Sequence, residues 1–273
     1  MALRIHHITS VNHVDLEPYR TLKRPIDHYQ RGIFIAEGEK VVRRLTESSL
    51  RMRSILLTKE WFAAYKSLLE PRVETIEVYV AEKDLMETIV GYPLHKGIMA
   101  LAEIPARTTI SKIAASTQHP FLFAAIDGIM NSENLGVIVR NCASFGVQAM
   151  LVGETSCDPY LRRAVRNSMG NVFVLPIVQL TDIAMELASL RNSFGVWLIA
   201  AHPRAGSRDA VTVDLTGDCC IIFGNEGHGI SDAVLSVCDE TVTIPMTNGV
   251  DSINVGSASA VLLYEARRQR SLQ

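Results

Sequence analysis

Polar side chains that could bind a ligand or take part in a reaction gather in three stretches of this 273-residue chain. The first runs from Asp127 to Arg140 and includes Asn131 and Asn134. Asn134 and Arg140 are six residues apart, which places them about 240° apart around a helix. They reach one site only if Asn134 lies at the helix mouth; otherwise the asparagines are ordinary caps and Arg140 is a surface arginine. The apolar neighbours of Arg140 favour a half-buried guanidinium, which needs an anionic partner.

The second stretch, Gly224-Asn225-Glu226-Gly227-His228-Gly229, directly follows a run of apolar residues. Three glycines after a buried strand let a ligand approach the backbone closely. The stretch is not a P-loop, because it lacks the Lys-Ser/Thr pair, and its glycine order does not match the dinucleotide-binding fingerprint. Glu226 can pair with a cation or cap a following helix. By themselves the glycines are equally compatible with a plain tight turn.

The third stretch, residues 244–260, places Ser252 and Asn254 ahead of a run of small residues that begins at Gly256. Small residues let another backbone or a ligand come close. Helix packing alone would account for them, but it would not account for the polar Ser252 and Asn254 that precede them.

The elements that would position these stretches follow from the pattern of the second half. Short, fully apolar segments alternate with helical ones, which is typical of a parallel sheet with helices on both faces. We expect strands at 121–126, 149–152, 172–175, 196–200, 219–223 and 241–244. We expect helices at 134–145, 159–168, 181–193, 231–237 and 254–270. Ligands of such sheets bind beyond the carboxyl ends of the strands, where the three stretches lie.

The pattern of apolar and helical segments in the first half predicts a smaller domain, an α/β sandwich. Its apolar segments place strands at 32–36, 54–57, 76–80 and 97–102, with helical stretches between them. A polar stretch at 105–120 marks the junction, so we expect one domain at 1–107 and a second at 108–273.

Composition excludes several classes of protein. With 48% hydrophobic residues and a net charge of −2, the chain is not disordered. No apolar run approaches the roughly 18 residues of a membrane-spanning helix, and the beginning lacks an apolar signal core. We therefore expect a cytoplasmic protein without membrane attachment. The 5 cysteines lack zinc-ligand spacing, so we expect reduced thiols, mostly buried, and no metal site.

Taken together and in this order, the three stretches resemble a known family. They are N-x-x-N-x-G-x-x-x-R at 131–140, F-G-N-E-G-H-G at 223–229, and I-P-M followed by S-I-N-V within 244–255. This set is similar to the SpoU (TrmH) family of RNA ribose methyltransferases in the SPOUT superfamily. Residues 34–40 resemble the substrate-binding domain common in these enzymes, which is related to a small RNA-binding ribosomal protein. One departure is Gly256, where the family usually has serine.

The resemblance implies a fold and a cofactor for the second domain. The expected fold is a parallel sheet with helices on both faces whose C-terminal segment threads through a loop as a trefoil knot, preceded by the small α/β RNA-binding domain. The expected cofactor is S-adenosylmethionine. The backbone of Gly224, Ile244 and Ile253 would hold its adenosyl part, and Met246 and Asn254 would also contact it.

The implied reaction is methyl transfer to a ribose 2′-hydroxyl, with ribosomal RNA as the favoured substrate. The catalytic positions carried over are Asn134, Arg140, Glu226, Ser252 and Asn254. A free guanidinium is a poor base because its pKa lies above about 12. Arg140 would instead anchor a phosphate and stabilise the forming alkoxide, while Asn134, Ser252 and Asn254 orient it and the ribose. Glu226 would fix the guanidinium or the loops.

Two kinds of partner are expected. RNA would be bound by the first domain through its basic clusters, which are Lys40, Arg43 and Arg44, and Arg51 and Arg53. A second copy of the chain would pack on residues 254–270, which are apolar at more positions than one core-facing stripe requires. Members of the family dimerise through the knotted domain, which points the same way.

Three alternatives remain open at this point. The substrate could be transfer RNA, or the chain could be a non-catalytic RNA-binding protein that retains the fold. The presence of all five catalytic positions speaks against the second of these. A nucleotide-dependent dehydrogenase is disfavoured because no G-x-G-x-x-G follows a first strand.

Overall fold

The computed structural model describes residues 3–203 and 206–271 and divides into two compact units. One unit comprises the chain up to Ala106 together with Tyr160–Phe173. The other comprises Arg107–Pro159 and the chain from Val174 onward. The division expected from the sequence assigned all of 108–273 to one domain. Tyr160–Phe173 differs from that expectation, because its aromatic side chains pack on Phe34 of the first unit, with ring centroids 5.3 Å and 5.5 Å away.

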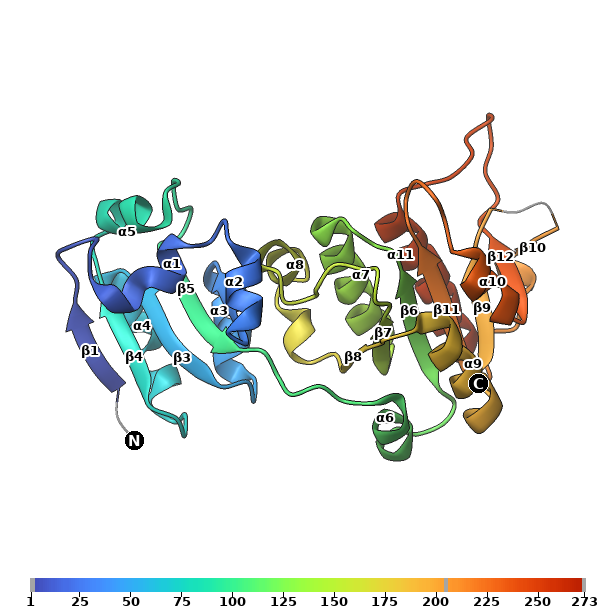
Figure 1. The fold of residues 1–273 in the computed structure, drawn as a ribbon, viewed down its shortest axis with the longest axis horizontal. Coiled ribbons are helices and arrows are strands. Elements are labelled where there is room, and N and C mark those ends of the chain that lie inside the picture. The colour runs from blue at the N-terminus through green and yellow to red at the C-terminus, as the bar shows by residue number, and fades with distance from the viewer. Residues whose placement is uncertain (1–2, 204–205, 272–273) are drawn as a thin grey trace. The chain divides into compact units, whose positions relative to one another are not determined.

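The first unit is built around a five-stranded sheet of order β1-β4-β3-β5-β2 (Figure 1). Strands β1, β4 and β3 are parallel, and β5 runs antiparallel to both β3 and β2. The elements are β1 (Leu3–His7), a 3₁₀ helix η1 (Val14–Leu16), α1 (Glu17–Arg20), α2 (Pro25–Gln30), β2 (Ile33–Glu37), α3 (Glu39–Glu47), β3 (Met52–Leu57), α4 (Lys59–Leu69), β4 (Ile76–Val80), α5 (Lys83–Val90), β5 (Ile98–Glu103), α8 (Arg162–Asn167) and the 3₁₀ helix η2 (Asn171–Phe173). The sequence predicted β2 to β5 but not β1, an edge strand in which no residue is fully buried.

The second unit has a seven-stranded, entirely parallel sheet of order β10-β12-β9-β11-β6-β7-β8. Its elements are α6 (Ile110–Ser116), β6 (Leu122–Asp127), α7 (Ser132–Phe145), β7 (Ala149–Val152), β8 (Ile177–Gln179), α9 (Ile183–Phe194), β9 (Trp197–Ala201), β10 (Arg208–Asp209), the 3₁₀ helix η3 (Ala210–Thr212), β11 (Cys219–Gly224), α10 (Asp232–Val237), β12 (Glu240–Thr243) and α11 (Val255–Arg270). The predicted α/β class with a parallel sheet is confirmed.

One predicted strand is wrong. Residues 172–175 do not enter the sheet, because Val172 and Phe173 belong to η2 and are buried in the first unit. The strand beside β7 is β8, five residues later in the chain. Apolar residues mark burial, and Val172 and Phe173 are buried by packing in the first unit rather than by strand pairing.

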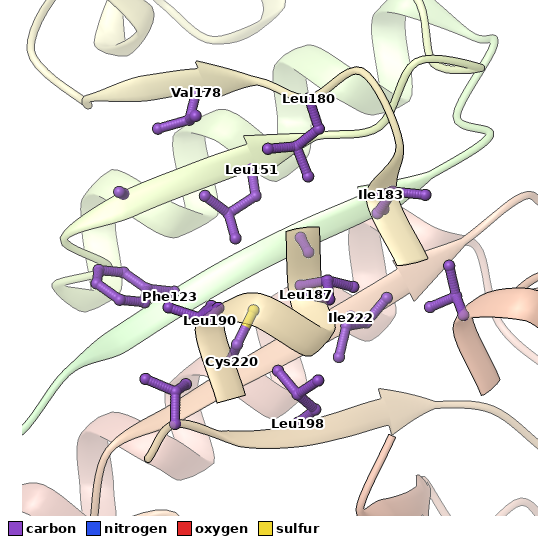
Figure 2. Packing of buried hydrophobic residues seen from close by; sticks show 14 of the residues in the cluster. Phe123, Leu151, Val178, Leu180, Ile183, Leu187, Leu190, Leu198, Cys220 and Ile222 are labelled. Atoms are coloured by element: carbon purple, nitrogen blue, oxygen red, sulfur yellow. The ribbon is translucent and has the colours of Figure 1, made fainter. Parts of the chain in front are cut away.

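Helices cover both faces of the second sheet. On one face, α6, α9 and α10 enclose a cluster in which Leu187 and Leu190 of α9 lie over Phe123, Leu198 and Ile222 (Figure 2). On the other face, α7 and α11 pack against each other. The backbones approach closely there, since a Cβ on Gly256 would lie 2.8 Å from Val137 Cγ1. Within the described ranges, no helix is long and apolar enough to cross a membrane.

Candidate active site

The three polar stretches singled out in the sequence meet at one edge of the second sheet. Strands β6 and β11 are parallel neighbours with Asp127 opposite Gly224, so the chain leaves both strands at the same edge. Asn225 Nδ2 donates a hydrogen bond of 2.7 Å to the carbonyl oxygen of Gly128, which ties the loop after β11 to the loop after β6. This is the edge at which parallel α/β sheets bind ligands.

The glycines after β11 are explained by a tight backbone loop. Asn225 and Gly229 exchange two backbone hydrogen bonds of 2.9 Å, and Asn225 Oδ1 accepts from the N–H groups of Gly227 and His228. A Cβ at Gly224 would lie only 2.4 Å from the backbone carbon of Gly229. Any other side chain at Gly224 would therefore displace the loop.

A chain of hydrogen bonds joins the three stretches. Asn134 Nδ2 donates to Glu226 Oε1, and Asn254 Nδ2 donates to Asn134 Oδ1 at 3.1 Å. Asn254 also caps α11, because its Oδ1 accepts from Gly256 N at 2.8 Å. The cap of α7 is Asn131, whose Oδ1 accepts from Glu133 N and Asn134 N. Asn134 lies in the first turn of α7, so its amide is available to bridge the other two stretches.

A cavity of about 540 Å³ opens beside this chain of hydrogen bonds. It is lined by the ends of β9, β11 and β12 and by the start of α11. All five residues expected to bind a cofactor line it, namely Gly224, Ile244, Met246, Ile253 and Asn254. Three of the expected catalytic residues line it as well, namely Glu226, Ser252 and again Asn254. Phe223, Val242 and Leu262 give it an apolar floor.

Arg140 is placed differently from the expectation. It is exposed on α7, it does not line the cavity, and its guanidinium makes no hydrogen bond or ion pair within the described part of the chain. The half-buried guanidinium expected from its apolar neighbours is therefore wrong. Ile138, Val139 and Cys142 are buried, whereas Arg140 lies on the remaining face of the helix.

His202 is a cavity residue that the sequence analysis missed. It follows β9 directly and lines the cavity with a ring nitrogen, Nδ1, that is buried and has no hydrogen-bond partner among the described residues. Ligands of parallel sheets bind beyond the strand ends, and this rule applies to β9 as well as to β6, β11 and β12. The position of His202 directly after β9 was therefore the signal that could have identified it.

The charges around the cavity are acidic or neutral. Glu226 and Asp251 contribute carboxylates, and the described lining residues include no lysine or arginine. Nucleotide cofactors with a pyrophosphate are usually held by cations or by a helix N-terminus. A ligand that carries positive charge fits this lining better.

The thiols near the site are not nucleophiles. All five cysteines are free, and Cys142, Cys219 and Cys220 are buried. Burial, together with the nearby carboxylates of Asp158 and Glu226, raises the pKa of Cys157 to about 11. The Cys157 thiol is therefore protonated at neutral pH. Within the described ranges, no cluster of three or more His, Cys, Asp or Glu residues could hold a metal ion.

Comparison with known proteins identifies the family. The profile of the SpoU rRNA methylase family matches residues 122–264. The chain belongs to this family. The SpoU-family protein is 32% identical over 260 residues to an uncharacterized tRNA/rRNA methyltransferase of Mycobacterium bovis, covering 93% of this chain and 88% of the relative. It is 32% identical over 180 residues to the 23S rRNA (guanosine-2'-O-)-methyltransferase RlmB of Vibrio cholerae, covering 64% and 71% of the two chains.

A solved structure gives the same result for the fold. The SpoU methyltransferase AviRb from Streptomyces viridochromogenes, in complex with the cofactor AdoMet, superposes with a TM-score of 0.82 at 26% identity. The match covers 96% of this chain and 100% of AviRb. The membership predicted from the three stretches is confirmed, while the trefoil knot stays a prediction.

Proposed function

We propose that this SpoU-family protein transfers the methyl group of S-adenosylmethionine to a ribose 2′-hydroxyl of ribosomal RNA. The observation that carries the proposal is the hydrogen-bonded series Glu226–Asn134–Asn254. It joins all three motif stretches at the rim of a cavity of a size typical for cofactors. The names of the relatives support RNA as the substrate and a ribose hydroxyl as the acceptor. The cytoplasmic location expected from the sequence stays a prediction.

The residues present fit S-adenosylmethionine. The cofactor is cationic at sulfur, and the cavity lining offers the carboxylates of Glu226 and Asp251. Ile244 lies one residue beyond β12 and Ile253 lies two residues before α11, so their backbone groups are outside the regular elements and free to hold an adenosyl group. Phe223, Val242 and Leu262 would cover its apolar surface.

The cofactor supplies a methyl group that is already activated for transfer. The chain's own residues must therefore align the acceptor oxygen and stabilise its developing negative charge. Asn134 and Asn254 hold each other in place and orient the ribose, and Ser252 adds a hydroxyl at the same cavity. Glu226 accepts a hydrogen bond from Asn134 and thereby fixes the loop after β11.

Arg140 acts on RNA rather than on another residue of its own chain. Its guanidinium is exposed and has no partner among the described residues, so it is available to an anion from outside. The planar guanidinium matches the geometry of a phosphate. We assign it the phosphate adjacent to the methylated ribose and the stabilisation of the forming alkoxide.

The active protein is a homodimer formed through the second unit. Val261 and Tyr264 of α11 are 42% and 57% exposed, and Tyr264 packs edge-on against Phe145 of α7. Apolar side chains exposed side by side on a helix are usually covered by a partner. Tyr264 contacts α7 at Phe145, so the dimer would also place a second chain against the helix that carries Arg140.

Binding and transfer measurements test the proposal. Calorimetry should give micromolar-range affinity for S-adenosylmethionine, about −8 kcal/mol, and no binding of NADH. Labelled S-adenosylmethionine should then methylate a 23S rRNA transcript, with transfer RNA as the comparison substrate. Binding of NADH alone would support the dehydrogenase alternative. RNA binding without any methyl transfer would support the non-catalytic one.

A further inference from the structure

Helix α8 is anchored on the first unit by a nearly buried carboxylate. Glu37, at the end of β2, is only 9% exposed. Its Oε2 accepts hydrogen bonds from Arg162 Nη1 and, at 3.0 Å, from the Tyr92 hydroxyl, and Arg166 Nη1 lies 3.5 Å from its other oxygen. The Arg162 guanidinium also lies 5.2 Å from the centroid of the Tyr92 ring. A buried carboxylate with these partners fixes the first turn of α8 firmly.

The segment that follows α8 is held against α3. Arg44 Nη1 donates a hydrogen bond of 2.7 Å to the carbonyl oxygen of Met169, two residues beyond the end of α8. Lys40 and Arg44 are four residues apart and share one face of α3. The face of α3 that carries these two cations therefore borders the chain segment of α8.

Both helices carry exposed cations. They are Lys40, Arg43, Arg44, Arg163 and Arg166, and we refer to them together as the α3–α8 surface. The chain as a whole has a net charge of −2, so this concentration of positive charge is local. The carboxylate of Glu37 is buried beneath it, and Glu47 forms only an exposed pair with Arg43 at 3.0 Å. Exposed pairs of this kind offset little of the field that a ligand meets.

The α3–α8 surface lacks the features of a protein-binding surface. None of the large hydrophobic side chains that are exposed in the described ranges lies on α3 or α8. Protein interfaces depend on apolar and aromatic anchors at their centre. A surface of exposed arginines and lysine without such anchors favours a phosphate backbone.

We infer that the α3–α8 surface holds the phosphate backbone of the RNA, with Arg163 and Arg166 contributing beside Lys40, Arg43 and Arg44. The inference rests on the proposed function, which makes RNA the substrate. It adds α8, a helix encoded in the middle of the methyltransferase half, to the RNA-binding unit.

Filter binding of a 23S rRNA transcript tests the inference. The double variant Arg163→Ala/Arg166→Ala should bind about tenfold more weakly than wild type at 0.1–0.2 M salt. Its plot of log affinity against log salt should be shallower by about one unit per arginine. The control Lys59→Ala/Lys66→Ala removes two exposed cations from α4 of the same unit and should change affinity less than threefold.

A charge-conserving variant and the affinity for S-adenosylmethionine separate a lost phosphate contact from a damaged protein. The variant Arg163→Lys/Arg166→Lys keeps the charges and should retain most of the salt slope, and S-adenosylmethionine affinity should be unchanged in every variant. If wild type binds RNA and Arg163→Ala/Arg166→Ala matches the α4 control, the inference is overturned. Weaker binding with an unchanged salt slope would overturn it too, because no phosphate contact would have been lost. Failure of wild type itself to bind any RNA would overturn the proposed function instead.

Discussion

Asn134 connects the three loops of the site, and Arg140 stands apart from them. Asn134 donates to Glu226 and accepts from Asn254, so its amide links the loop after β11 to the start of α11. Arg140 makes no such contact in the described part of the chain and is exposed. The two residues therefore have different tasks. Asn134 holds the loops together, whereas the role we propose for Arg140 is to bind a phosphate of the substrate.

This division predicts how Arg140 variants behave. Arg140→Ala should lower the methylation rate more than tenfold, a loss above ~1.4 kcal/mol, while S-adenosylmethionine affinity stays near that of wild type. Arg140→Lys should recover only part of the rate, because an ammonium cannot reproduce the planar fork. Single-turnover kinetics and calorimetry on the same preparations measure both quantities. If the Arg140→Ala enzyme kept more than a tenth of the wild-type methylation rate, Arg140 would not be a catalytic residue.

Gly256 shows why this chain departs from the serine usual in its family. A Cβ there would lie 2.8 Å from Val137 Cγ1 and 3.1 Å from Asn254 Oδ1, so a side chain would collide with α7 and with the cap of α11. Gly256→Ser should therefore destabilise the fold by about 1–3 kcal/mol, the usual cost of overpacking. Denaturant unfolding measures the change. Adding Val137→Ala should restore part of the loss, and a fully additive double variant would argue against the collision.

At the scale of elements, the loop after β11 depends on the close approach of Gly224 to the backbone of Gly229. Gly224→Ala should displace residues 225–229, because its Cβ would lie 2.4 Å from the backbone of Gly229. We expect S-adenosylmethionine affinity to fall more than tenfold by calorimetry. Gly217→Ala is the matched control, since nothing lies within 4 Å of a Cβ there. Equal affinity in the two variants would show that the loop does not shape the cofactor cavity.

Buried elements could be predicted from the sequence, whereas exposed elements and helix orientations could not. Strands such as β6 and β11 are buried along nearly their whole length, so their apolar runs identify them without structural information. β1 is an edge strand rich in polar side chains and gives no such signal. The three loops were found from residue types and order. The orientation of Arg140 could not be predicted in this way. It depends on how α7 is rotated against α11, and that rotation is set by the contact of Val137 with Gly256.

At the scale of the whole molecule, the exposed apolar side chains of α11 predict a dimer. Sedimentation equilibrium at tens of micromolar protein should give twice the mass of one chain. Val261→Asp/Tyr264→Asp should shift the equilibrium to monomer, because burying two carboxylates in an apolar interface is costly. Val73→Asp, at an exposed valine of the first unit, is the control and should remain dimeric. A wild-type monomer under these conditions would contradict the dimer.

The position of the transferred methyl group tests the account most directly. A 23S rRNA transcript incubated with S-adenosylmethionine deuterated at its methyl group can be digested to nucleosides and analysed by mass spectrometry. We predict labelled 2′-O-methyl nucleoside with wild-type protein and at least tenfold less with Arg140→Ala, although that variant still binds the cofactor. Label on a base instead of the ribose, or no label in RNA that the protein demonstrably binds, would contradict it.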